Sequence, residues 1–131
     1  MRILALDYGA RRTGVAVSDP TGTIASPLGV VELAGTPAGL TEIAEIVARH
    51  GAELVVVGLP LTLRGEHGSQ ARETGTFIQA LQAALGVPVE TYDERFTTAI
   101  ASQAAGDFPE DARAAAHLLD SYLAWKSARE T

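Results

Sequence analysis

Three carboxylates in separate parts of the sequence could together carry out phosphodiester chemistry: Asp7, Glu94 and Asp111. Asp7 ends one apolar run, Glu94 follows another, and Asp111 is expected in the first turn of a long helix. Carboxylates that lie close together repel one another unless cations neutralise them. Mg²⁺ and Mn²⁺ prefer such oxygen ligands, and two of these ions can activate a water and stabilise the leaving oxygen of a phosphodiester. We therefore expect these residues to be both catalytic residues and ligands of two ions.

Each carboxylate also has a simpler interpretation. Asp7 could cap the turn that follows it, and Glu94 could pair with Arg12 or Arg95. Asp111 could serve only the dipole of its helix. The catalytic interpretation therefore depends on the three acids lying together. That arrangement requires the first, fourth and fifth strands to be parallel neighbours, so that Asp7 and Glu94 open onto the same edge.

Five arginines lie in or beside expected loops, where they could bind phosphate oxygens. The guanidinium group suits phosphate because its planar donors bond two oxygens at once. His67, in a polar glycine-containing loop over 61–70, could contact phosphate or assist proton transfer. Each of these side chains could also be no more than a solvated loop residue. The arginines are Arg11, Arg12, Arg64, Arg72 and Arg95.

Composition limits the classes of protein to which the chain can belong. Its 131 residues fit one domain over 1–131, and the absence of cysteine excludes disulfides and thiolate metal sites. The net charge of −6 argues against a strongly basic nucleic-acid binder. No apolar run approaches the ~20 residues that span a bilayer, and residues 1–6 are too short for a signal peptide. We expect a cytoplasmic protein without a membrane partner.

Hydrophobic periodicity predicts five strands and four helices. Gly9 and Gly14 are expected to bracket the turn between the first two strands, and Pro27 suggests that the third strand lies at an edge. The predicted strands cover residues 3–6, 15–17, 23–31, 54–57 and 87–92. The predicted helices cover 36–51, 71–86, 97–105 and 107–128.

The order of these elements favours an α/β fold with a five-stranded mixed sheet. Three strands joined by short turns form an antiparallel meander, and crossover helices then lead to two parallel strands, with helices on both faces of the sheet. In open sheets of this kind, ligands bind beyond the carboxyl ends of the parallel strands. Asp7 and Glu94 would both open onto that edge.

Four segments, in this order, resemble the YqgF/RuvX family. They are LDYGARRTGVAVSD at 6–19, VVVGLP at 55–60, DERFTT at 93–98 and DARAAAHLLDSYL at 111–123. The resemblance implies an RNase H-like fold and a nuclease. Two activities are ascribed to the family, namely pre-16S rRNA processing and Holliday junction resolution.

The resemblance also implies the residues of the site. The acidic residues of the family fall on Asp7, Glu94 and Asp111, which are the residues already selected on chemical grounds. Nucleic-acid contacts are implied for the loop after Pro60 and for three arginines. These arginines are Arg11, Arg12 and Arg95. The family usually carries a Lys/Arg-rich segment before its last helix, whereas residues 99–110 contain no basic residue.

The expected function is therefore that of a metal-dependent endonuclease acting on structured nucleic acid. Maturation of the 5′ end of an rRNA precursor is the preferred substrate assignment, and resolution of a four-way DNA junction is the direct alternative. The catalytic residues do not discriminate between the two, because both reactions hydrolyse a phosphodiester. A resolvase must cut opposed strands at two active sites, and so requires a homodimer.

Two alternatives come from other functional classes. Residues 7–14 could form the first phosphate loop of an actin- or sugar-kinase-type ATPase. Such a protein needs a second phosphate loop and a second domain, for which 131 residues leave no room. A non-catalytic binding or assembly factor could share the nuclease fold. The presence of all three candidate acids argues against that alternative.

Overall fold

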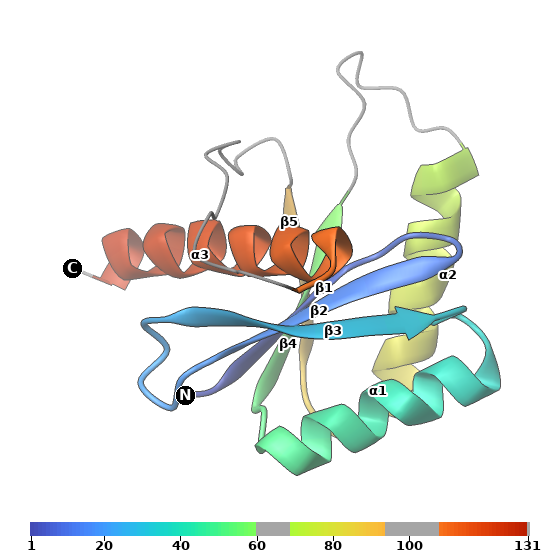
Figure 1. Cartoon of the computed structure of the whole chain (residues 1–131), viewed down its shortest axis with the longest axis horizontal. Coiled ribbons are helices and arrows are strands. Elements are labelled where there is room, and N and C mark those ends of the chain that lie inside the picture. Colours follow the sequence, from blue (N-terminus) through green and yellow to red (C-terminus); the bar gives the residue numbers. More distant parts are fainter. Residues whose placement is uncertain (60–68, 94–107, 131) are drawn as a thin grey trace.

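A computed structural model of the chain describes residues 1–59, 69–93 and 108–130, which contain five strands and three helices (Figure 1). The strands are β1 (Ile3–Asp7), β2 (Arg12–Ser18), β3 (Ala25–Glu32), β4 (Leu54–Leu59) and β5 (Val89–Asp93). The helices are α1 (Pro37–His50), α2 (Ser69–Ala84) and α3 (Glu110–Glu130).

The strands form one mixed sheet in the order β3-β2-β1-β4-β5. β1 pairs in parallel with β4, and β4 with β5, whereas β1–β2 and β2–β3 are antiparallel. This arrangement confirms the predicted meander followed by two parallel strands. It also confirms the edge position that Pro27 suggested, because β3 is an outer strand.

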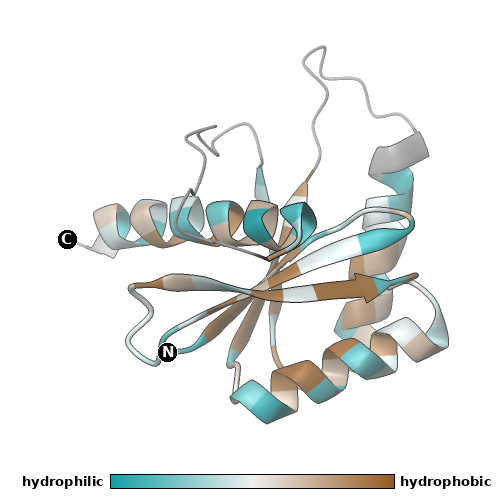
Figure 2. Cartoon of the chain, in the orientation of Figure 1, coloured by the Kyte–Doolittle hydropathy of each residue, from teal (hydrophilic) through white to brown (hydrophobic). Residues whose placement is uncertain are grey.

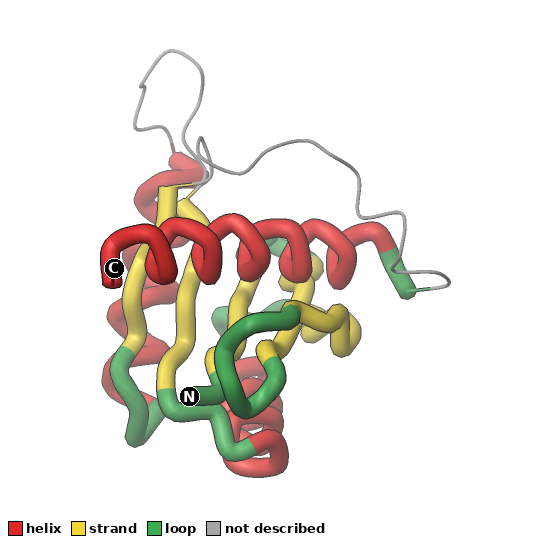
Figure 3. The backbone as a smooth tube through the Cα atoms, turned by 90° about the vertical axis from the view of Figure 1, so that its left-hand side faces the viewer, coloured by secondary structure: helices red, strands yellow, loops and turns green. Residues whose placement is uncertain are grey.

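The sheet is covered by helices on both faces, as predicted. Leu4 and Leu6 of β1 join the apolar cluster under α1 and α2, and Ile3 and Ala5 join the cluster under α3. All four are at most 2% exposed. Figure 2 shows the apolar character of the strands, and Figure 3 shows α3 lying across the sheet with α1 and α2 on its far side. Because side chains alternate along a strand, the odd-numbered residues of β1 face α3.

Helix α1 begins and ends where the sequence predicts. The side chain of Thr36 accepts a hydrogen bond from the N–H of Gly39 at 3.1 Å, and Pro37 occupies the first helical position. Gly51 ends the helix with a positive φ of 64°, a conformation that glycine adopts without strain. Local capping residues therefore fix this element.

The hairpin between β1 and β2 is tighter than the sequence suggested. Gly14 was expected to close the turn, with the strand starting at Val15, and this prediction is wrong. β2 begins at Arg12, and Gly14 pairs with Asp7 inside the ladder. The reason is tertiary, since Gly14 lies beneath α3 and its missing side chain lets that helix approach.

The other bounds differ from the predictions by only a few residues. β3 starts at Ala25, β5 starts at Val89, and α2 starts at Ser69. The short helix predicted over 97–105 lies outside the described residues. None of the described helices combines the length and the apolar character that a membrane-spanning helix needs.

Candidate active site

Asp7 is the last residue of β1, at the carboxyl end of the central strand of the sheet. It follows the fully buried residues 3–6 and is itself half-buried. Its position in the alternation of β1 places it on the same face as Ile3 and Ala5, the face that α3 covers. Within the described residues, the Asp7 carboxylate has no hydrogen-bond or ion-pair partner. A carboxylate placed in this way is available to bind a cation.

Asp111 reaches the same place from the opposite end of the chain. It lies in the first turn of α3, directly above Gly14. A Cβ added to Gly14 would stand only 1.8 Å from the Asp111 carbonyl oxygen. Since Gly14 is the ladder partner of Asp7, the sheet brings Asp7 and the start of α3 together at one edge. The backbones at Asp7 and Asp111 therefore lie close together, and joint action of their carboxylates stays a prediction.

Arg12 adds a cation that the sequence analysis assigned to nucleic acid. Its Nε lies 3.0 Å from Oδ2 of Asp111, and the two side chains are 54% and 41% exposed. Within the described residues, Arg12 pairs with Asp111; Glu94, considered above as a partner of Arg12, lies outside them. The sequence pattern does not indicate the Arg12–Asp111 pair, because the pair depends on how α3 crosses β2.

The third candidate acid, Glu94, lies outside the described residues, as do Arg64, His67 and Arg95. Their assignment remains a prediction. The strand that leads to Glu94 is described: β5 ends at Asp93, which pairs with Leu59 of β4. β1, β4 and β5 are parallel neighbours, as the prediction required, so their carboxyl ends open onto one edge. Two strand spacings, about 10 Å, separate β1 from β5.

The donors at this edge fit a hard divalent cation. Asp7 and Asp111 supply only carboxylate oxygens, which Mg²⁺ and Mn²⁺ prefer. In the ranges that the structure describes, no cluster of three potential ligands is present. The two carboxylates therefore form the described part of the predicted three-acid set.

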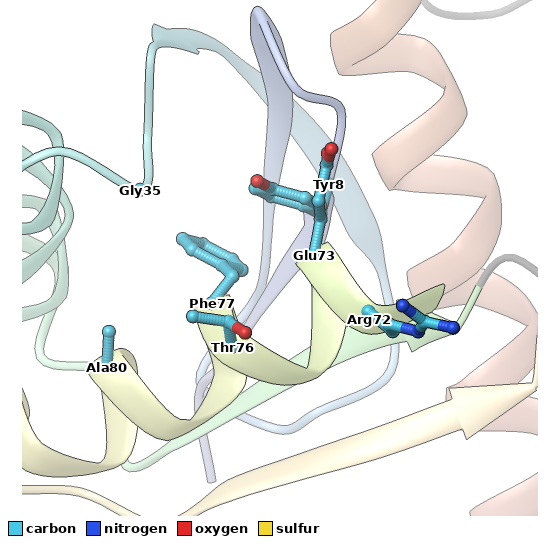
Figure 4. Close-up of a pocket in the computed structure, with 7 residues that line it drawn as sticks. All are labelled: Tyr8, Gly35, Arg72, Glu73, Thr76, Phe77 and Ala80. Carbon is cyan, nitrogen blue, oxygen red and sulfur yellow. The ribbon is translucent and has the colours of Figure 1, made fainter. Parts of the chain in front are cut away.

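A pocket of about 310 Å³, not predicted from the sequence, lies on the other face of the sheet, close to Asp7. Tyr8, directly after Asp7, stacks on Phe77 of α2 with ring centroids 4.3 Å apart (Figure 4). Burial and the nearby charge of Glu73 raise the pKa of the Tyr8 phenol. An aromatic residue next to a candidate acid was the signal in the sequence. Arg72, one of the predicted phosphate contacts, is exposed in the first turns of α2 and lines this pocket.

Arg11, the remaining predicted contact, is exposed in the hairpin just before Arg12. The Arg11 carbonyl accepts a hydrogen bond from the N–H of Leu33 at 2.9 Å. This bond ties the hairpin to the end of β3, so that the Arg11 side chain is carried on an anchored backbone. Arg11 and Arg12 together place two cations beside the carboxyl end of β1.

Comparison with known proteins identifies the family. The RuvX profile, described as "Holliday junction resolvase", matches residues 1–125. The chain belongs to the RuvX family. A relative from Chloroflexus aggregans, named "Putative pre-16S rRNA nuclease", is 50% identical over 101 residues, covering 77% of this chain and 71% of the relative. A Syntrophomonas wolfei relative with the same name is 36% identical over 132 residues, and the match covers 94% of this chain and 94% of the relative.

Solved structures show that this RuvX chain has the RNase H-like fold. Thermus thermophilus RuvC in complex with a Holliday junction matches with a TM-score of 0.69 at 18% identity, covering 98% of this chain and 96% of RuvC. The Fowlpox virus resolvase bound to junction DNA matches with a TM-score of 0.50 at 12% identity, over 99% and 98% of the two chains. The predicted family and fold are both confirmed.

Proposed function

We propose that this RuvX-family chain is a metal-dependent endonuclease that hydrolyses phosphodiester bonds in structured nucleic acid, and that its substrate is the 5′ region of pre-16S rRNA. The observation that carries the proposal is the meeting of Asp7 and the start of α3 above Gly14. The names of the curated relatives support both the nuclease activity and the rRNA substrate.

Asp7 and Asp111 would hold Mg²⁺ or Mn²⁺, with Glu94 as the predicted third ligand. Bound ions of this kind supply an activated water and charge stabilisation for the leaving oxygen. The protein residues hold the scissile phosphate at the edge of the sheet, where Arg11 and Arg12 provide guanidinium donors for its oxygens. In this proposal no side chain serves as the nucleophile.

The Arg12–Asp111 pair is compatible with this role. Both side chains are about half-exposed, so water screens the pair and little free energy is needed to separate it. Arg12 could therefore exchange its carboxylate partner for a phosphate oxygen when substrate binds. The freed Asp111 carboxylate would then be available to a cation.

Junction resolution is the second candidate substrate assignment. The family description and the fold shared with junction-bound RuvC favour it. Resolution needs two active sites that cut opposed strands, and hence a homodimer. Full activity of a monomer on rRNA precursor, with no paired cuts in a junction, would support the RNA assignment.

The test is cleavage of a pre-16S rRNA 5′ fragment and a four-way DNA junction in Mg²⁺ or Mn²⁺. We expect Asp7→Asn and Asp111→Asn each to lower the rate at least about 100-fold, equivalent to about 2.7 kcal/mol of barrier. Asp120→Asn removes the same charge from an exposed site on α3 and should leave the rate unchanged. Undiminished cutting by Asp7→Asn, or in excess EDTA, would contradict the proposed site.

A further inference from the structure

The pocket beside Tyr8 is not used by the chemistry proposed above. It lies between α2, the end of β1 and the loop that leads into α1, with a volume of about 310 Å³. Figure 4 shows Tyr8 and Gly35 on one side and three residues of α2, Phe77, Thr76 and Ala80, on the other. This volume is at the lower end of the range for small-ligand sites, so the pocket suits a small, flat group.

The walls offer a flat apolar surface. Phe77 is 2% exposed and supports the ring of Tyr8 at an interplanar angle of 20°. Tyr8 itself is only half-buried, so part of its ring remains at the surface of the pocket. Gly35 and Ala80, which also line the pocket, take up little of its space because Gly35 has no side chain and that of Ala80 is small. Aromatic rings in such settings stack with unpaired bases.

A few polar groups complete the lining. Glu73 supplies a carboxylate, Thr76 a hydroxyl and Tyr8 a phenol. Arg72 adds an exposed guanidinium group at the same site. A mainly apolar cavity with a few convergent polar groups is typical of a ligand site. A carboxylate accepts hydrogen bonds from exocyclic amino groups, and a guanidinium group binds phosphate.

The pocket lies next to the candidate active site, because Tyr8, which lines the pocket, directly follows Asp7 in the sequence. Asp7 faces α3, and Tyr8, the next residue, packs on α2 on the opposite face of the sheet. A nucleic-acid strand that crosses the carboxyl edge of the sheet would therefore pass both residues. Its phosphate could lie at Asp7 while a neighbouring base turns toward Tyr8.

We propose that this pocket receives one unpaired nucleobase of the substrate strand and prefers bases with an exocyclic amino group. The inference rests on the proposed function, because it takes the strand to lie along the edge that carries Asp7 and Asp111. Glu73 accepts from the amino group, Tyr8 provides the stacking surface, and Arg72 contacts the adjacent phosphate. Turning a base out of its stack costs free energy, and that free energy is lowest for a base in a single-stranded segment.

The test is an NMR titration of the full chain, without divalent ions, with AMP, CMP, UMP and ribose 5-phosphate. The titration measures the affinity of each compound. We expect AMP and CMP to bind at least tenfold more tightly than ribose 5-phosphate, and CMP severalfold more tightly than UMP. Shifted amide signals should come from Tyr8 and from α2. Equal binding of ribose 5-phosphate and the nucleotides would overturn the proposal.

Two matched variants distinguish the effect of filling the pocket from a general effect of a larger side chain on α2. Ala80→Leu places a larger side chain in the pocket, whereas Ala83→Leu makes the same change at an exposed position of the same helix. Only Ala80→Leu should abolish the advantage of AMP over ribose 5-phosphate. Equal effects of the two variants would contradict the pocket.

Glu73→Gln tests the amino-group preference at an exposed position where folding is not at risk. We expect it to reduce the CMP-to-UMP ratio toward one, and an unchanged ratio would refute the role of Glu73. Because these titrations need neither metal nor turnover, their failure is distinguishable from failure of the nuclease proposal. If cleavage depends on Asp7 but the chain shows no preference for nucleotides, the proposed nuclease function stands and the nucleobase pocket is refuted.

Discussion

Arg12 and Asp111 bring opposite charges together where the strand and the helix meet. Their separation of 3.0 Å is that of a charge-assisted hydrogen bond, but each side chain is about half-exposed. Exposed pairs contribute at most about 1 kcal/mol to stability. The pair therefore adds little to stability, and under the proposed function Arg12 would neutralise the Asp111 carboxylate until a divalent cation replaces it.

Replacing Arg12 by Gln should separate the two effects. We expect the free energy of unfolding, measured in urea, to change by less than about 1 kcal/mol. Mn²⁺ affinity, measured by calorimetry, should rise severalfold because Asp111 loses its competing cation. Arg11→Gln, at the exposed neighbouring position, is the control and should change Mn²⁺ affinity less. Weaker Mn²⁺ binding by Arg12→Gln would show that the pair does not compete with the metal.

Asp19 makes a different kind of residue-level contribution. Its Oδ1 accepts hydrogen bonds from the N–H of Ile24 at 2.8 Å and of Thr23 at 2.7 Å, and Oδ2 accepts from the Thr21 hydroxyl. These bonds, that of Ile24 foremost, hold the pKa of Asp19 well below its usual value. The folded state therefore favours the ionised carboxylate. This stabilisation is present above the unfolded pKa of about 3.9 and is lost as the pH falls below it.

Asp19→Asn should accordingly lower the thermal midpoint at pH 7, because the amide cannot supply the charge. The difference from wild type should shrink steadily as the pH falls from about 4 to 2, because the carboxylate becomes protonated in the unfolded state while the folded state still holds it ionised. Thermal unfolding followed by circular dichroism at several pH values measures this. Glu45→Gln, at an exposed position of α1, should show no such trend. A difference independent of pH would contradict the role of the charge.

At the scale of elements, the contact of α3 with β2 determines whether the acids meet. Gly14 leaves no room for a side chain, since a Cβ would overlap the Asp111 carbonyl oxygen. Gly29 lies in the neighbouring strand β3, and nothing stands within 4 Å of a Cβ placed there. The same substitution at these two positions therefore tests the contact specifically.

Gly14→Ala should destabilise the chain by about 1–3 kcal/mol, the usual cost of overpacking, and should also lower cleavage, because α3 must move away from Asp7. Gly29→Ala should have little effect on either quantity. Urea unfolding and the cleavage assay measure the two effects. Similar results for the two variants would indicate that α3 tolerates displacement from the sheet without loss of the site.

The elements themselves could be predicted largely from local signals. The apolar run before Asp7, the Thr36 cap and Gly51 fix β1 and α1 within a residue or two. The role of Gly14 and the partner of Arg12 could not be predicted, since both depend on packing of segments distant in sequence. The position of Asp111 followed from its place at the start of a helix together with the resemblance, rather than from periodicity alone.

At the scale of the whole molecule, the net charge of −6 limits how the chain binds nucleic acid. Attraction must come from local arginines, since the whole chain repels a polyanion. The absence of basic residues over 99–110 restricts this attraction further. Binding should therefore involve few phosphates.

We expect a shallow salt dependence of binding. The slope of log affinity against log salt should stay well above the value of about −9 that ten phosphate contacts would produce. Fluorescence anisotropy with labelled rRNA fragment and the Asp7→Asn variant measures the slope without cleavage. A slope near −9 or steeper would show that the net charge is a poor guide to the binding surface.

The central claim is that Asp7 and Asp111 jointly hold divalent ions at the carboxyl edge of the sheet. Electron paramagnetic resonance of free Mn²⁺ during a titration of the full chain tests it most directly. We expect two bound ions in the wild type, at least about tenfold weaker affinity in both Asp7→Asn and Asp111→Asn, and unchanged binding in Asp120→Asn. Equal Mn²⁺ binding by all four proteins would contradict it.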